Sequence, residues 1–164
     1  MRLRTAAATV FATAILLCGA ASTASAQEHD VELPAGVACD FAFGLDGGAL
    51  PPVRKTFTDP NGNLIVVMLR AGKSGAVTYT NLDTGKALTF PSRGTALRDT
   101  TQSDGTTHLL EFSGNVGIIL FPGDDPTGPS TTQINGRLVL KQEGSVTTVL
   151  KQEGHQIDVC AALS

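Results

Sequence analysis

The chain has 164 residues, of which 41% are hydrophobic and 16% are charged, and its formal net charge is −3. This length suits one domain, and the hydrophobic fraction argues against a disordered chain. The sequence has no run rich in Lys and Arg, which nucleic-acid binding needs to neutralise phosphates. Composition therefore predicts one globular domain without a nucleic-acid partner, and it does not identify a function.

The first 26 residues have the pattern of a secretory signal peptide. Arg2 and Arg4 form a positive n-region, residues 10–18 are apolar, and Ala24-Ser25-Ala26 offers a small-x-small cleavage site. The apolar run is too short to span a bilayer, and without an Arg-Arg pair the twin-arginine route is not indicated. We therefore expect an extracellular protein that starts at Gln27, whose formal charge changes from −3 to −5 once the two arginines are removed.

Cleavage at this site also changes the cysteine count. Cys18 leaves with the leader, and an even pair, Cys39 and Cys160, remains. A rival interpretation makes Cys18 a lipoprotein acceptor, but Leu17 before it is a poor match to the small residue required there. In an oxidising compartment a lone pair most often forms a disulfide, with two free buried thiols as the alternative. A bridge would close a loop of roughly 120 residues and contribute about 4 kcal/mol, and we predict that it ties the first strand to the last.

Segments of period-2 alternation follow one another along the mature chain, separated by turn sequences. We expect residues 27–36 to be a flexible N-terminal segment and residues 37–164 to form one all-β domain. Turns are indicated at Asp59-Pro60-Asn61-Gly62-Asn63 and Ser103-Asp104-Gly105. The expected strands are 38–45, 53–58, 64–69, 76–80, 87–90, 97–102, 106–112, 116–121, 137–142, 146–151 and 155–159. About ten short strands with hairpin-length links predict an antiparallel meander.

One short repeat stands inside this pattern. The sequence VLKQEG occurs at residues 139–144 and again at 149–154. An offset of ten residues corresponds to one strand plus one turn, so the repeat predicts duplicated hairpin geometry.

The cysteine pair bears on how the meander closes. A bridge between the first and last strands favours a closed β-barrel, which removes both sheet edges, and a β-sandwich with a bridge between its sheets is the alternative. Leu64–Leu69 and Val116–Phe121 are apolar on both faces, so one face of each needs a cover. The N-terminal segment, a long loop or another subunit would serve, and the last would give a homodimer through an exposed apolar strand face.

Few residues fall in patterns typical of catalysis or metal binding. The chain contains no Gly-x-Ser-x-Gly elbow and no phosphate loop. His29 falls in the N-terminal segment, whereas His108 shares a strand face with apolar side chains, as a structural histidine does. His155 and Asp158 are three residues apart, a spacing that does not place them on one strand face. We therefore expect no catalytic residue, no metal and no cofactor.

The segment 122–132, PGDDPTGPSTT, departs from the strand pattern. A long Pro- and Gly-rich loop in a compact β domain is often functional. The candidate binding residues are Asp124, Asp125, Thr127 and Ser130, which would hold a cation through the two carboxylates or present a rigid epitope. The alternative is a solvated crossover between barrel strands.

Several motifs together carry a family resemblance. They are Cys39-Asp40-Phe41, Phe57-Thr58-Asp59, Thr80-Asn81-Leu82-Asp83-Thr84-Gly85, Leu120-Phe121-Pro122, Gly128-Pro129-Ser130-Thr131-Thr132 and Asp158-Val159-Cys160-Ala161-Ala162-Leu163. The set resembles a group of small exported proteins of actinobacteria that have no established activity. The resemblance implies export and the terminal cysteine pair, and it carries over no catalytic residues.

Three functions fit this sequence. The first is a secreted, non-enzymatic β-barrel that binds a small apolar ligand or an envelope component, because apolar strand surface is in surplus. The second is a protein-interaction factor, an inhibitor or adhesin, that presents the loop 122–132 to an extracellular protein. The third is a barrel-fold enzyme that uses scattered carboxylates with His108 as the base.

Overall fold

The computed structural model describes residues 29–47, 53–70, 75–91 and 94–164, and the expected signal peptide 1–26 lies outside them. These residues form two antiparallel β-sheets and one short helix, so the predicted all-β class is confirmed. Within the described ranges neither sheet closes on itself. The expected closed barrel is therefore wrong, and the sandwich alternative fits the two sheets better.

The small sheet has four strands in the order β1-β2-β5-β6. Their bounds are β1 (Val31–Leu33), β2 (Phe43–Gly47), β5 (Ala76–Asn81) and β6 (Ala87–Pro91). β1 lies within the segment 27–36 that the sequence analysis left outside the domain, and it pairs in register with β2, as Leu33 with Phe43. The sheet therefore begins before residue 37.

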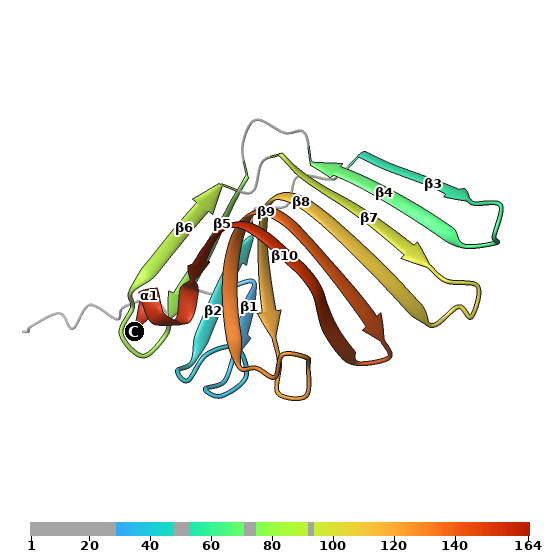
Figure 1. Ribbon diagram of the computed structural model, residues 1–164. Coiled ribbons are helices and arrows are strands. Elements are labelled where there is room, and N and C mark those ends of the chain that lie inside the picture. Colours follow the sequence, from blue (N-terminus) through green and yellow to red (C-terminus); the bar gives the residue numbers. More distant parts are fainter. Residues whose placement is uncertain (1–28, 48–52, 71–74, 92–93) are drawn as a thin grey trace, which may run out of the picture.

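The large sheet has six strands in the order β10-β9-β8-β7-β4-β3 (Figure 1). Their bounds are β3 (Val53–Thr58), β4 (Leu64–Arg70), β7 (Thr95–Thr101), β8 (Thr107–Leu120), β9 (Ser130–Glu143) and β10 (Val146–Asp158). The chain builds β1 and β2 in the small sheet, β3 and β4 in the large one, then returns for β5 and β6. It leaves again for β7 to β10 and ends in α1 (Val159–Leu163). Because of these crossovers the strands do not follow one meander.

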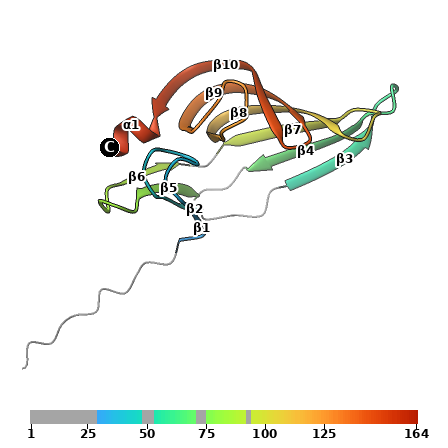
Figure 2. The ribbon, with the colours of Figure 1, turned by 90° about the horizontal axis from the view of Figure 1, so that it is seen from below.

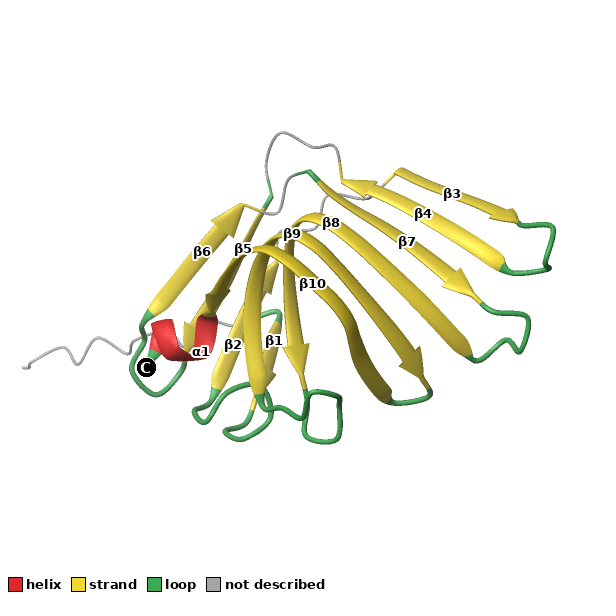
Figure 3. Cartoon of the chain, viewed as in Figure 1, coloured by secondary structure: helices red, strands yellow, loops and turns green. Residues whose placement is uncertain are grey.

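Three of the strands are longer than the sequence analysis expected, and they arch (Figures 1 and 3). β8 joins two expected strands, and so does β10, because Gly114 and Gly154 lie inside a strand instead of in a turn. Gly114 pairs with Gly136, which pairs with Gly154, so the three form a row across the sheet. A Cβ at any of them would collide with backbone atoms of a neighbouring segment. Glycine inside a strand marks a bend or a close backbone approach, and we infer that the long strands bend at this glycine row.

The two VLKQEG repeats lie on the neighbouring strands β9 and β10, and they are paired only through Val139 with Lys151 and Leu140 with Val149. Residues 139–144 end β9 and its hairpin turn, whereas residues 149–154 lie wholly within β10, with Leu140 paired to Val149. The expectation of duplicated hairpins is therefore wrong, since no turn follows the second copy. The repeat instead produces equivalent ion pairs, Lys141 with Glu143 and Lys151 with Glu153.

The apolar interior divides into two clusters. The first, here the disulfide core, contains Ala38, Cys39, Phe43, Tyr79, Val159 and Leu163. The second, here the arch core, contains Val116, Ile118, Leu120, Ile134, Leu138 and Leu140. In the apolar run Val116–Phe121 the alternate residues Val116, Ile118 and Leu120 are buried within the molecule, whereas Phe121 at its end is 43% exposed. In Leu64–Leu69 only Ile65 and Val66 are buried, and both end residues are exposed.

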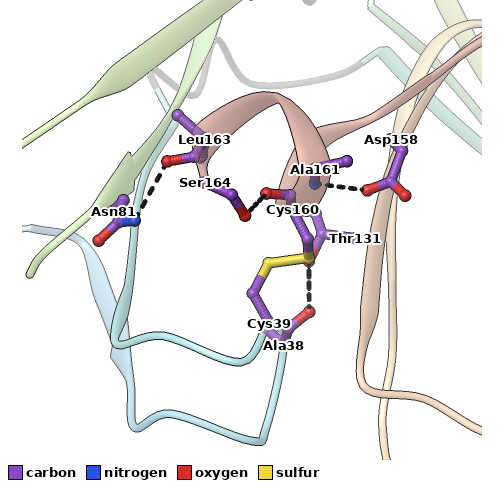
Figure 4. Close-up of a disulfide and its surroundings, with 9 residues drawn as sticks. All are labelled: Ala38, Cys39, Asn81, Thr131, Asp158, Cys160, Ala161, Leu163 and Ser164. Atoms are coloured by element: carbon purple, nitrogen blue, oxygen red, sulfur yellow. Dashed lines mark hydrogen bonds between the residues drawn. A yellow bond between two sulfur atoms is a disulfide. The ribbon is translucent and has the colours of Figure 1, made fainter. Parts of the chain in front are cut away.

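The predicted disulfide is present, and it joins Cys39 to Cys160 with their Cα atoms 5.4 Å apart. Neither cysteine lies in a strand. Cys39 precedes β2, and Cys160 lies in α1, which packs beside the small sheet (Figures 2 and 4). The bridge therefore ties the connection between β1 and β2 to the C-terminal helix, and the expected link between first and last strands is wrong. Asp158 caps this helix by accepting a hydrogen bond from the Ala161 N–H at 2.9 Å.

Candidate functional site

A cavity of about 330 Å³ lies between the two sheets. Its described lining is mostly apolar and comes from β2, β4, β5, β7 and β8. The lining residues are Leu45, Met68, Val77, Tyr79, Thr95, Leu97, Phe112, Asn115, Val116 and Gly117. None of them carries a charged side chain. A concave, mostly apolar site with a few polar groups is the usual form of a small-molecule pocket.

Tyr79 forms the most strongly constrained part of this wall. Its side chain is 1% exposed, and its ring packs against those of Phe43 and Phe90, with centroids 5.8 and 5.9 Å away. The phenol donates a hydrogen bond to Oε1 of Gln133, on β9, at 2.9 Å. Burial raises the pKa of Tyr79 to about 12, because desolvation penalises the phenolate. The phenol is therefore neutral at ordinary pH.

Gly117 makes room for this phenol. It lies on β8 in the cavity wall, and a Cβ there would collide with the Tyr79 hydroxyl. The hydroxyl thus sits against bare backbone and bridges the small sheet to β9 of the large sheet. Its oxygen, which donates to Gln133, still has lone pairs that can accept a hydrogen bond.

The loop 122–132, the site predicted from the sequence, is anchored along the arch. Asp124 is 6% exposed, and its carboxylate accepts hydrogen bonds from the N–H groups of Phe121 and Thr147, both at 2.7 Å. Asp125 forms a short parallel bridge with the start of β10, donating to the carbonyl of Thr147 and accepting from the N–H of Val149. These contacts attach the loop to the start of β10.

The other two candidate residues have local roles in the same segment. Thr127 donates through Oγ1 to the Asp124 carbonyl at 3.2 Å. Ser130 is the first residue of β9 and pairs with Leu120. Both Asp124 oxygens thus accept hydrogen bonds from backbone N–H groups.

The histidines lie apart from one another. Nδ1 of His29 lies 2.7 Å from a carboxylate oxygen of Asp46, and Nδ1 of His108 lies 3.0 Å from Oδ1 of Asp99. His155 is exposed on β10. Across the part of the chain that the structure describes, no three His, Cys, Asp or Glu side chains gather into a metal-binding group.

The cavity was not predicted from the sequence. Its lining comes from five strands that the crossovers bring together, and strand alternation alone does not show which inner faces meet. One signal was available: Tyr79 is the single tyrosine, in a strand otherwise made of small and β-branched residues. A large aromatic ring with a polar end in such a strand marks a position where a hydroxyl needs a buried partner.

Comparisons with known proteins add no relative: no family model, no curated protein and no solved structure matches this chain. Among the described residues no helix has the length and apolar character needed to cross a membrane.

Proposed function

We propose that this protein is a secreted, non-enzymatic module that binds a small apolar ligand, or the apolar part of an envelope component, between its two sheets. The observation that carries the proposal is the cavity of about 330 Å³ with its mostly apolar wall. This volume falls at the lower end of the range of about 300–1,000 Å³ for small-molecule sites. The expected barrel interior is thus replaced by the space between two sheets.

The chemistry of the wall supports an apolar ligand with at most a few polar atoms. Side chains such as Met68, Leu97 and Phe112 gain free energy when an apolar group replaces water against them. The Tyr79 oxygen offers one hydrogen-bond acceptor at this wall, which suits a ligand hydroxyl or N–H.

The secreted location is part of this proposal and has two supports. The sequence has a signal-peptide pattern over residues 1–26. The Cys39–Cys160 disulfide is of a kind that persists in oxidising compartments and is rare in the cytosol.

The test uses the fact that the chain has one tyrosine and no tryptophan. Intrinsic fluorescence therefore reports on Tyr79, in the cavity wall. We expect N-phenyl-1-naphthylamine to bind the folded protein with blue-shifted emission and to quench Tyr79. Val77→Phe fills the cavity and should weaken binding at least about tenfold, whereas Val31→Phe, the same change at an exposed position of the same sheet, should not.

Two results would count against the proposal. One is the absence of probe uptake by the folded wild-type protein. The other is equal binding by the Val77→Phe and Val31→Phe variants, which would place the probe on the surface. If instead the probe binds the wild-type protein and Val77→Phe weakens it, native mass spectrometry of protein from its own culture medium would identify the natural ligand.

A further inference from the structure

β3 (Val53–Thr58) is the outermost strand of the large sheet, and it has an unpartnered side. It pairs with β4 alone in the described structure, and all six of its residues are exposed. The exposed fractions of Val53 and Phe57 are 60% and 51%, and Leu69 beside Val53 is 45% exposed. These three side chains share one face of the sheet, because paired residues project on the same side. An edge with such a face is a template for another strand.

The register shows which backbone groups point outward. The Asp59 N–H donates to the Asn63 carbonyl at 3.0 Å, so these two residues form a hydrogen-bonded pair. Hydrogen-bonded and non-bonded pairs alternate along an antiparallel ladder. Counting back from Asp59, residues 53, 55 and 57 bond to β4. The N–H and C=O groups of Arg54, Thr56 and Thr58 therefore point away from the sheet and remain available to a new strand.

We propose that the strand that pairs there is β3 of a second copy of this chain, in an antiparallel, two-fold symmetric arrangement. Symmetric pairing must match even-numbered residues with each other, because these carry the outward-pointing groups. Two such registers pair five residues of each copy, and they place Lys55 or Thr56 opposite its own copy. The first brings the two Lys55 charges together, which is destabilising. The second brings only the two Thr56 residues together.

In this second register residues 54–58 of one copy lie opposite residues 58–54 of the other. Lys55 then faces Phe57 of the second copy, and Arg54 faces Thr58, so neither basic residue meets a like charge. A Lys ammonium over a Phe ring is favourable, and the Lys stem covers the exposed ring. The two basic residues, which alone would protect an edge from pairing, here select one register.

The contact is small for a permanent dimer. Stable interfaces bury about 1,200–2,000 Å², more than five paired residues on each side supply. We therefore expect a concentration-dependent dimer. This inference stands apart from the ligand cavity, and a failure of either leaves the other intact.

The experiment combines sedimentation velocity over a concentration series with a proline substitution in β3 and a matched proline substitution in β6. Thr56→Pro removes an outward N–H and leaves the ladder to β4 unbroken, since proline is accepted on that side of an edge strand. It should weaken dimerisation at least about tenfold. Thr89→Pro, the same change at an exposed position of the other sheet's outer strand β6, is the matched control and should leave the dimer unchanged.

Cysteine cross-linking tests the register. Opposed Thr56 residues would have Cα atoms about 5.5 Å apart, so Thr56→Cys should give a disulfide-linked dimer. Lys55→Cys should not, because the two residues at position 55 lie on a diagonal at about 7–8 Å, beyond disulfide reach. Three outcomes would each overturn the proposal. The protein could remain monomeric at every concentration, or it could cross-link through position 55. The third outcome is that an acidic peptide binds along β3 of a protein that does not self-associate.

Discussion

The disulfide core and the arch core are built from different kinds of sequence neighbours. The disulfide core joins residues near 40, Tyr79 and the helix that ends at Leu163, so its contacts close long loops. The arch core comes from β8 and β9, which are consecutive and in register over fourteen pairs. Closing a long loop costs more chain entropy than closing a hairpin. The covalent bond lies in the core that needs it.

Each core is also stabilised by its own backbone feature. The disulfide core uses a helix of five residues with an Asp158 cap, which delivers Cys160 and Leu163 to the small sheet. The Asn81 side chain holds the far end of this helix by donating to the Leu163 carbonyl at 3.1 Å (Figure 4). In the arch core the glycine row allows neighbouring backbone segments to approach closely, and Asp124 joins the loop 122–132 to the start of β10. A substitution that disrupts one of these features should therefore destabilise its own core first.

The largest effect is expected from Gly136→Val in the glycine row. Its Cβ would collide with the backbone of residues 153 and 154 on β10, which cannot move without breaking the β9–β10 ladder. We expect a loss of about 4 kcal/mol or more, the range of exceptional single substitutions. Urea unfolding followed by circular dichroism measures it.

Gly47→Val is the matched control, because a Cβ at residue 47 meets nothing within 4 Å. It should change the stability by less than about 0.5 kcal/mol. Equal and small effects of the two substitutions would mean that the arch does not depend on the glycine row.

The second effect is expected from removing the disulfide. Cys39→Ala with Cys160→Ala releases a constraint across 121 residues, and the chain-entropy model gives a loss of about 4 kcal/mol, within an observed range of about 2–5. Alanine avoids placing a hydroxyl at residue 39, whose side chain is 1% exposed. Amide hydrogen exchange should show lost protection in α1 and retained protection around Ile134 and Leu138. Equal loss of protection in both cores would contradict the division of the interior into two separately stabilised cores.

Much of the strand pattern was predictable, because alternation and turn residues are local properties. The strands near 53–58, 64–69, 76–80 and 87–90 match β3 to β6 closely. The predicted strands were wrong where one residue type has two roles. Gly144 lies in a hairpin turn with a φ of 60°, whereas Gly154, in the same VLKQEG context, lies inside β10. Only the cross-strand partner of Gly154, which is Gly136, distinguishes the two roles.

The site was less predictable than the fold. The Cys39–Cys160 pair could be inferred because two cysteines allow one pairing. The cavity depends on which strands enter which sheet, and that is decided by crossovers whose packing is non-local. Asp124 shows a related difficulty, since a carboxylate in a polar loop suggested a ligand, whereas its partners are backbone N–H groups, one of them 23 residues away.

The smallest effect concerns Tyr79, whose hydroxyl connects the two cores by its bond to Gln133 on β9. Burial raises the pKa of Tyr79 to about 12, from an ordinary value of 10. Between these values the unfolded phenol has lost its proton and the folded one keeps it, so stability falls as pH rises from 10 to 12. The contribution lost over this range is on the order of 2 kcal/mol. Below pH 10 it is fully present.

Absorbance at the phenolate band measures this titration directly, because the chain has one tyrosine. Tyr79→Phe removes the titrating group and is the control for lysines, which also lose charge at high pH. The variant should lose the extra decline between pH 10 and 12 and should be less stable by about 1–3 kcal/mol at neutral pH, because Gln133 loses its buried partner. If the phenol of the folded protein titrates near 10, water reaches the hydroxyl at Gly117. The bond between the cores would then be open to solvent and would contribute little to holding the sheets together.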